Sequence, residues 1–103
     1  MIDQAAVDAV IRTLAEAARP EQIVLFGSHA RGDARDDSDL DLLVIESSVA
    51  DRGDEMVRLR RLLRPLRIPV DVLVATVDEV ARYRHQPGHV LYWAMKEGRR
   101  VYG

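Results

Sequence analysis

Cysteine is absent from the sequence, which excludes disulfide bonds and thiolate metal sites. The chain also has no apolar run near the roughly 20 residues that a membrane-spanning helix needs. Its first residues lack the basic and apolar segments of a secretion signal. The formal net charge of −2 gives no general attraction to nucleic acid or to a membrane. These absences predict a cytoplasmic protein without a membrane partner, and they argue against nucleic acid as its direct substrate.

The length and the apolar content of the sequence predict one domain over residues 1–103. Hydrophobic residues make up 48% of the 103, which is enough for one modest core. Apolar periodicity, capping residues and Pro or Gly breaks divide the chain into alternating elements. We expect helices over 3–18, 54–66, 76–84 and 89–96, strands over 21–28, 40–45 and 70–74, and a short edge strand over 99–102.

A polar stretch joins the first two predicted strands and begins with Gly27-Ser28. A Gly-Ser directly after a strand lets the backbone turn tightly and offers main-chain N–H groups and a hydroxyl to a phosphate. If Ala30 and Arg31 open a short helix, its N-terminal dipole favours the same anion. Two roles stay open for Arg31 and Arg35, contact with a phosphate or neutralisation of neighbouring aspartates.

Two carboxylates follow at the start of the second strand. Asp39 and Asp41 are two residues apart, so their side chains project from one face with Cα atoms roughly 6.5–7 Å apart. Side by side on an apolar strand, they repel each other and lose hydration unless a cation lies between them. Mg²⁺ accepts one or two protein carboxylates and completes its shell with water and phosphate oxygens. A solvated turn is the alternative for an Asp-x-Asp pair.

A third acid, Asp71, interrupts the apolar run of residues 70–74. A buried carboxylate without a partner is costly, so an acid in this place suggests a functional role. The alternative is an Asp at an exposed strand end.

The pattern of residues 27–41 resembles the signature of the nucleotidyltransferase fold of the DNA polymerase beta superfamily: Gly27-Ser28, ten residues and then Asp39-x-Asp41. The surrounding sequence is most similar to the minimal nucleotidyltransferase (MNT) family. The resemblance covers essentially the whole chain. It implies an α/β (α+β) fold, with a small mixed β-sheet and helices packed mainly on one face. It also implies ATP as substrate, bound by Gly27 and Ser28, and two Mg²⁺ ions held by the catalytic acids Asp39, Asp41 and Asp71. Arg31 is the further candidate for nucleotide binding.

The MNT resemblance further implies a partner. Such proteins are commonly antitoxins of helical HEPN ribonuclease toxins, in a hetero-oligomer, and they transfer AMP to a tyrosine of the toxin. Larger relatives carry a helical domain that this sequence lacks, so we expect another protein to supply the acceptor surface. Two alternatives stay open: an antitoxin that neutralises its toxin by binding alone, and an enzyme acting on a small hydroxylated molecule such as an aminoglycoside.

The arginines of residues 58–67 and the histidines allow more than one interpretation. Five arginines between Arg58 and Arg67 decorate the second long predicted helix, either as its solvated face or as a docking surface for a partner. The histidines have no metal-ligand spacing, and His85 and His89 are expected to be structural or on the surface. His29 differs from them because it lies inside the predicted phosphate loop, where contact with the nucleotide is possible.

Overall fold

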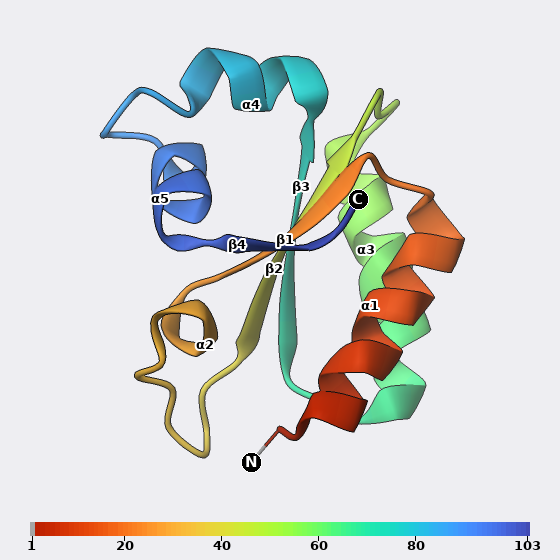
Figure 1. Ribbon diagram of the computed structural model, residues 1–103. Helices are drawn as coiled ribbons and strands as arrows, with labels where there is room; N and C mark the ends of the chain where they lie inside the picture. The colour runs from red at the N-terminus through yellow and green to blue at the C-terminus, as the bar shows by residue number, and fades with distance from the viewer. Residues whose placement is uncertain (1) are drawn as a thin grey trace.

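The computed structural model describes residues 2–103, and a four-stranded sheet organises it (Figure 1). The strand order is β3-β2-β1-β4. β1 runs antiparallel to both β2 and β4, whereas β2 and β3 are parallel. The expected mixed sheet is therefore confirmed, including the short edge strand at the C-terminal end. The strands are β1 (Gln22–Phe26), β2 (Leu40–Glu46), β3 (Val70–Thr76) and β4 (Arg99–Tyr102).

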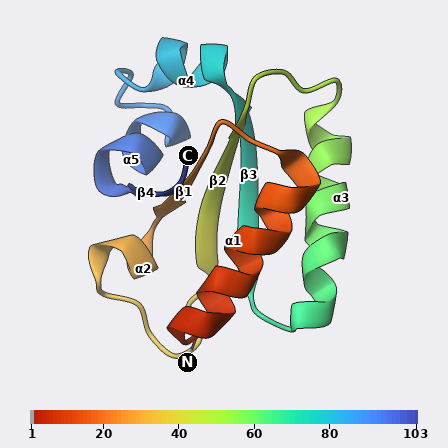
Figure 2. The ribbon, with the colours of Figure 1, turned by 45° about the vertical axis from the view of Figure 1, so that its right-hand side comes forward.

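The two long helices, α1 (Gln4–Ala18) and α3 (Arg52–Leu63), lie side by side on one face of the sheet (Figures 1 and 2). Apolar residues at helical spacing on α1 and α3 meet alternate residues of the strands, as the two periodicities require. This face holds the larger core. Its buried members are Val10, Leu14, Ile23, Leu25, Leu40, Leu42, Val44, Leu59, Leu63, Val72 and Val74.

The opposite face carries a thinner layer, formed by the short helices α4 (Val77–Tyr83) and α5 (Val90–Glu97). Helices therefore cover both faces of the sheet, the two long ones on the first face and the short ones on the second. The buried residues of this second cluster are Val24, Leu43, Ile45, Ala75, Val80, Leu91 and Ala94.

Local signals place the helix ends close to their expected positions. The Asp3 carboxylate accepts from the Ala6 amide at 2.8 Å and caps α1. Thr76 and Glu79 form a capping box at the start of α4, the pattern of residue types that marks a helix N-terminus. The helix expected over 54–66 ends as an α-helix at Leu63 and continues as the 3₁₀ turn η1 (Arg64–Leu66), because Pro65 has no N–H to continue an α-helical ladder.

A buried acid lies at the C-terminal end of β2, far along the strand from the Asp-x-Asp pair. The Glu46 side chain is buried, and its Oε2 has no hydrogen-bond partner. Burial, and then the hydrogen bond and the charge of Glu55, raise the pKa of Glu46 to about 7 from its ordinary 4.5. Hydrogen bonding to Arg58 lowers the pKa of Glu55, so the pKa values of Glu46 and Glu55 move in opposite directions.

We therefore predict that Glu46→Gln removes a pH dependence of stability. Between pH 4.5 and about 7, the folded chain binds more protons at Glu46 than the unfolded chain does, so this contribution is complete below that range and is lost as the pH rises through it. The free energy of unfolding is measured by urea titration at pH 5 and pH 8. The value for the glutamine variant minus that for the wild type should be larger at pH 8 than at pH 5. The gain is at most about 1.4 kcal/mol for each pH unit crossed. Glu21→Gln, at an exposed position, serves as control, and equal pH slopes for wild type and Glu46→Gln would contradict the prediction.

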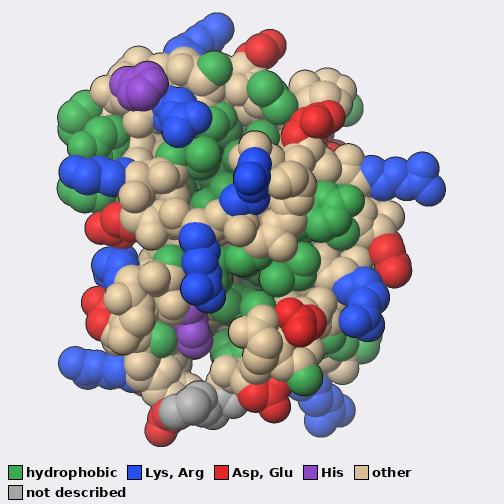
Figure 3. Space-filling view, in the orientation of Figure 1, with side chains coloured by type: hydrophobic (Ala, Val, Ile, Leu, Met, Phe, Trp, Pro, Cys, Tyr) green, Lys and Arg blue, Asp and Glu red, His purple; other side chains and the backbone are tan. Residues whose placement is uncertain are grey.

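The surface agrees with the low net charge. On the face shown in Figure 3, basic and acidic side chains are interspersed and no large patch of one sign appears. Among residues 2–103, no helix combines the length and apolar character needed to cross a membrane.

Candidate active site

Along the parallel strands β2 and β3, one face of the sheet is apolar and buried at one end and acidic at the other. Leu43 and Ala75 are buried there under α4 and α5. Two residues before Leu43 on the same face lies Asp41, and its register partner on β3 is Asp71. Asp39 precedes the first residue of β2 and shares this alternation. The three predicted acids therefore gather at the N-terminal ends of neighbouring strands, where α4 and α5 no longer cover the sheet.

Gly27 lies directly against this acidic surface. Phe26, the last residue of β1, is the register partner of Asp41, and the chain then turns at Gly27 with φ of 71° and ψ of −155°. A Cβ at Gly27 would overlap with Oδ2 of Asp41 and would lie 3.1 Å from its Cγ. Only glycine adopts this backbone conformation readily and leaves room for the carboxylate. The predicted phosphate loop and the predicted metal carboxylates thus meet at this point.

The short helix α2 (Ser28–Arg31) begins at the same turn. The strand expected over 21–28 therefore ends earlier, at Phe26, and the helix starts two residues before Ala30. The carbonyl oxygen of Gly27 accepts from the amides of Ala30 and Arg31, both at 3.1 Å. No side chain caps the start of α2, so its first amides are available to an anion. α2 packs against β1 and β2, and β2 is the strand that carries Asp41.

The electrostatics of Asp41 favour a bound cation. Burial, followed by the negative charges of Asp71 and Asp39, raises the pKa of Asp41, while the positive charges of His29 and Arg31 oppose the rise. A divalent cation would relieve this repulsion, and carboxylate oxygens are the ligands that Mg²⁺ prefers. The donor set of Asp39 and Asp41 therefore fits Mg²⁺.

Asp71 has a different neighbour. Its Oδ1 accepts from Nη2 of Arg60 at 3.0 Å. Among residues 2–103, no three His, Asp or Glu side chains converge closely enough to hold one metal ion. The fold brings the three carboxylates to one surface, but it does not aim them at a single point.

Comparison with known proteins decides the family. The model of the family "Polymerase beta, Nucleotidyltransferase" matches residues 8–103. The chain belongs to this nucleotidyltransferase family. The superfamily resemblance seen in the sequence is thereby confirmed. No curated protein matches the chain.

Two solved structures share the fold of this nucleotidyltransferase. One is a tri-AMPylated HEPN toxin from Shewanella oneidensis in complex with MNT antitoxin, with 20% identity and a TM-score of 0.64, where the match covers 97% of this chain and 71% of the other. The second is a toxin–antitoxin with AMP-PNP, with 22% identity and a TM-score of 0.64, covering 93% and 73%.

Arg31 is engaged by acids in this nucleotidyltransferase. Its Nε donates to Asp33 at 3.2 Å and its Nη1 to Glu97 at 3.0 Å. The hydrogen bonds to Glu97 and Asp33 raise the pKa of Arg31. These contacts match the neutralising role that the sequence left open, and they tie α2 to the end of α5. Contact of Arg31 with a phosphate stays a prediction.

His29 has a positioning contact that sequence reasoning missed. Its Nε2 donates to the carbonyl oxygen of Ser38 at 3.1 Å, and Ser38 immediately precedes Asp39. His29 therefore connects α2 to the segment that precedes Asp39, the first of the predicted acids. No local pattern indicates this contact, because it spans nine residues of irregular loop. His89 caps α5 through Nδ1 and stacks on Tyr83, as expected of a structural histidine.

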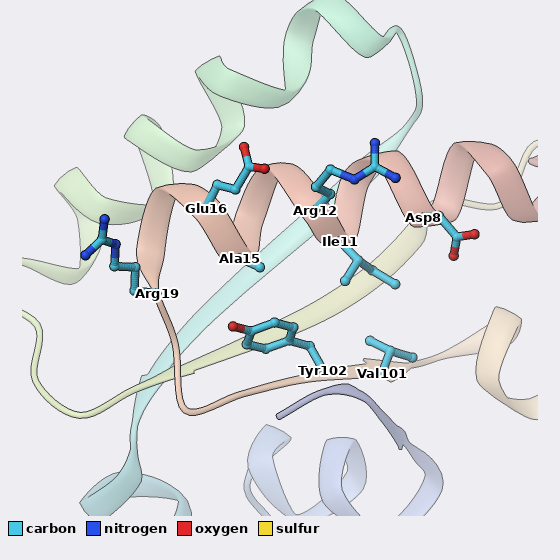
Figure 4. A pocket seen from close by; sticks show the side chains of 8 residues that line it. All are labelled: Asp8, Ile11, Arg12, Ala15, Glu16, Arg19, Val101 and Tyr102. Atoms are coloured by element: carbon cyan, nitrogen blue, oxygen red, sulfur yellow. The ribbon is translucent and has the colours of Figure 1, made fainter.

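A hollow of about 530 Å³ lies away from these acids, between α1 and β4 (Figure 4). Apolar side chains form part of its wall and charged side chains of α1 surround it. It contains none of the predicted site residues of the nucleotidyltransferase. Its lining residues are Asp8, Ile11, Arg12, Ala15, Glu16, Arg19, Val101 and Tyr102.

Proposed function

We propose that residues 1–103 act as one Mg²⁺-dependent nucleotidyltransferase domain that transfers AMP from ATP to a hydroxyl of a partner protein. The acceptor is a tyrosine of a HEPN ribonuclease toxin, and the chain acts as the antitoxin in a cytoplasmic hetero-oligomer. The observation that carries the proposal is the packing of Gly27 against the Asp41 carboxylate. This packing joins an anion-binding turn to an acidic surface, and a nucleoside triphosphate with its cation requires both.

Each group has a role in this reaction. The amides at the start of α2 and the Ser28 hydroxyl bind the outer phosphates. Asp39, Asp41 and Asp71 would hold Mg²⁺, which neutralises triphosphate charge and favours ionisation of the acceptor hydroxyl when bound. The acceptor oxygen forms a bond to the α-phosphorus, the bond to pyrophosphate breaks, and Asp71 takes the hydroxyl proton. Positioning and charge neutralisation supply most of the rate enhancement.

The choice of acceptor rests on similarity of fold. One structural neighbour is an AMPylated HEPN toxin in complex with MNT antitoxin, and the other is a toxin–antitoxin with AMP-PNP. These descriptions concern those proteins, and we extend them to this chain as a hypothesis. A protein acceptor also suits the open position of the acids, since the helices of the described chain leave them uncovered.

Intact mass spectrometry of the partner that co-purifies with the chain tests this proposal. The complex is incubated with Mg²⁺ and each nucleoside triphosphate in turn, with wild type and Asp39→Asn side by side. Asp39→Asn keeps the shape of the side chain and removes its charge. We expect the partner to gain the mass of one or more AMP groups, with ATP and the wild-type chain only.

The control outcome separates catalysis from binding. Both forms should still form the complex, because Asp39 lies on the exposed surface and contributes nothing to the core. A stable complex without any mass gain for the wild-type chain would contradict the proposal. That result would favour an antitoxin that neutralises its partner by binding alone.

A further inference from the structure

Arg60 approaches the acidic surface from the opposite layer of the molecule. It lies on α3, where its neighbours Leu59 and Leu63 are buried in the larger core. β3 is an edge strand beside α3. Nη2 of Arg60 donates to Oδ1 of Asp71 at 3.0 Å and to the carbonyl oxygen of Val72 at 3.5 Å. Arg60 thus holds the third acid at the edge of the sheet.

The contact explains why three aligned acids do not form a ready metal site. Register places Asp71 beside Asp41 on one face of the sheet. In the described chain, the Asp71 carboxylate has no hydrogen bond or ion pair other than that to Arg60. The positive charge of the Arg60 guanidinium offsets the negative charge of Asp71. In the absence of Arg60, a bound metal ion would offset that charge.

The pair is exposed enough to exchange. The Arg60 side chain is 48% exposed and that of Asp71 is 61% exposed. Ion pairs of this kind contribute little to stability, because water solvates both partners and holding two side chains in place costs entropy. A divalent cation held by Asp39 and Asp41 would therefore meet little resistance in drawing Asp71 away from Arg60.

We propose that Arg60 competes with a divalent cation for Asp71 and so lowers the cation affinity of the site. The inference rests on the metal-binding role of Asp71 in the proposed function. Arg60 is a positioning residue here: it holds Asp71 in the metal-free chain and releases it when the cation is bound. The full set of three acids forms only after that release.

Binding of Mn²⁺ alone to the full chain tests this competition, with the free ion followed by electron paramagnetic resonance. Arg60→Ala is compared with Arg61→Ala, its neighbour on α3. Arg61 is exposed and has no ion pair within residues 2–103, so both variants remove one positive charge. We expect Arg60→Ala to bind Mn²⁺ about three- to fivefold more tightly than Arg61→Ala, the range that loss of an exposed ion pair allows.

A second comparison tests whether the effect passes through Asp71. In an Asp71→Asn background, Arg60→Ala should leave the Mn²⁺ affinity unchanged. Equal affinities of Arg60→Ala and Arg61→Ala would overturn the inference, and so would an Arg60→Ala effect that persists in Asp71→Asn. If Arg60 merely protects the sheet edge, its removal will shift the urea unfolding midpoint and leave Mn²⁺ affinity unchanged.

The same titration separates this inference from the proposed activity. Asp41→Asn should abolish the Mn²⁺ binding that Arg60→Ala strengthens, and unaltered binding in Asp41→Asn would overturn the competition by placing the metal elsewhere. If the competition holds while no partner gains AMP in the mass experiment, the proposed transfer fails and the role of Arg60 stands.

Discussion

Replacing Asp41 by asparagine is expected to lower the rate of AMP transfer by on the order of 10²–10³-fold, the loss seen when one preorganised charge-stabilising group is removed from an active site. The amide keeps the shape of the side chain against Gly27 and removes the negative charge that would hold Mg²⁺. The rate is measured as AMP incorporated into the partner per unit time at saturating ATP.

The same variant should be at least as stable as the wild type at pH 7. Burial and the charges of Asp71 and Asp39 raise the pKa of Asp41, so ionisation of Asp41 costs the folded chain free energy that the neutral asparagine avoids. Urea unfolding without metal measures this. A gain in stability with a loss of activity is the mark of a site built for function at the expense of stability.

Asp37→Asn provides the control, because Asp37 is exposed in the loop that precedes the acids. It removes one negative charge close to the site in sequence, and it should leave the transfer rate within about twofold of wild type, as for surface substitutions in general. Transfer by Asp41→Asn at the wild-type rate would show that Asp41 has no catalytic role.

Gly27→Ala is expected to have the second large effect. Gly27 has a positive φ of 71° with an extended ψ, a region that only glycine populates readily. The added methyl group would also overlap with the Asp41 carboxylate. We expect a loss of about 1–3 kcal/mol in the free energy of unfolding, together with a fall of at least about tenfold in affinity for AMP-PNP measured by calorimetry.

Gly32→Ala is the matched control for this variant. Gly32 also has a positive φ, of 82°, but a Cβ there would have no atom within 4 Å. Gly32→Ala should therefore cost about 1 kcal/mol in stability from backbone strain and leave AMP-PNP affinity unchanged. Equal losses of nucleotide affinity in the two variants would mean that the approach of Gly27 to Asp41 is unimportant for binding.

Short-range physics accounts for what could be predicted from the sequence. Helix caps such as Asp3 and the Thr76–Glu79 box act within three or four residues, so the pattern of residue types reveals them. The alternation of a strand places Asp39 and Asp41 on one side without knowledge of any neighbour. The Gly27-Ser28 turn before a short helix is equally local, and its resemblance to a known signature supplied the family.

The sequence by itself determined the elements, the Asp39-x-Asp41 pair and the Gly27-Ser28 turn, because each depends on residues close together in the chain. The tertiary structure alone decided which groups meet across elements. The parallel register of β2 and β3 places Asp71 beside Asp41, the β1–β2 pairing brings Gly27 against the same carboxylate, and the packing of α3 delivers Arg60 to Asp71. These contacts depend on how whole elements dock, and a shift of one residue in strand register would turn the acids to the other face of the sheet.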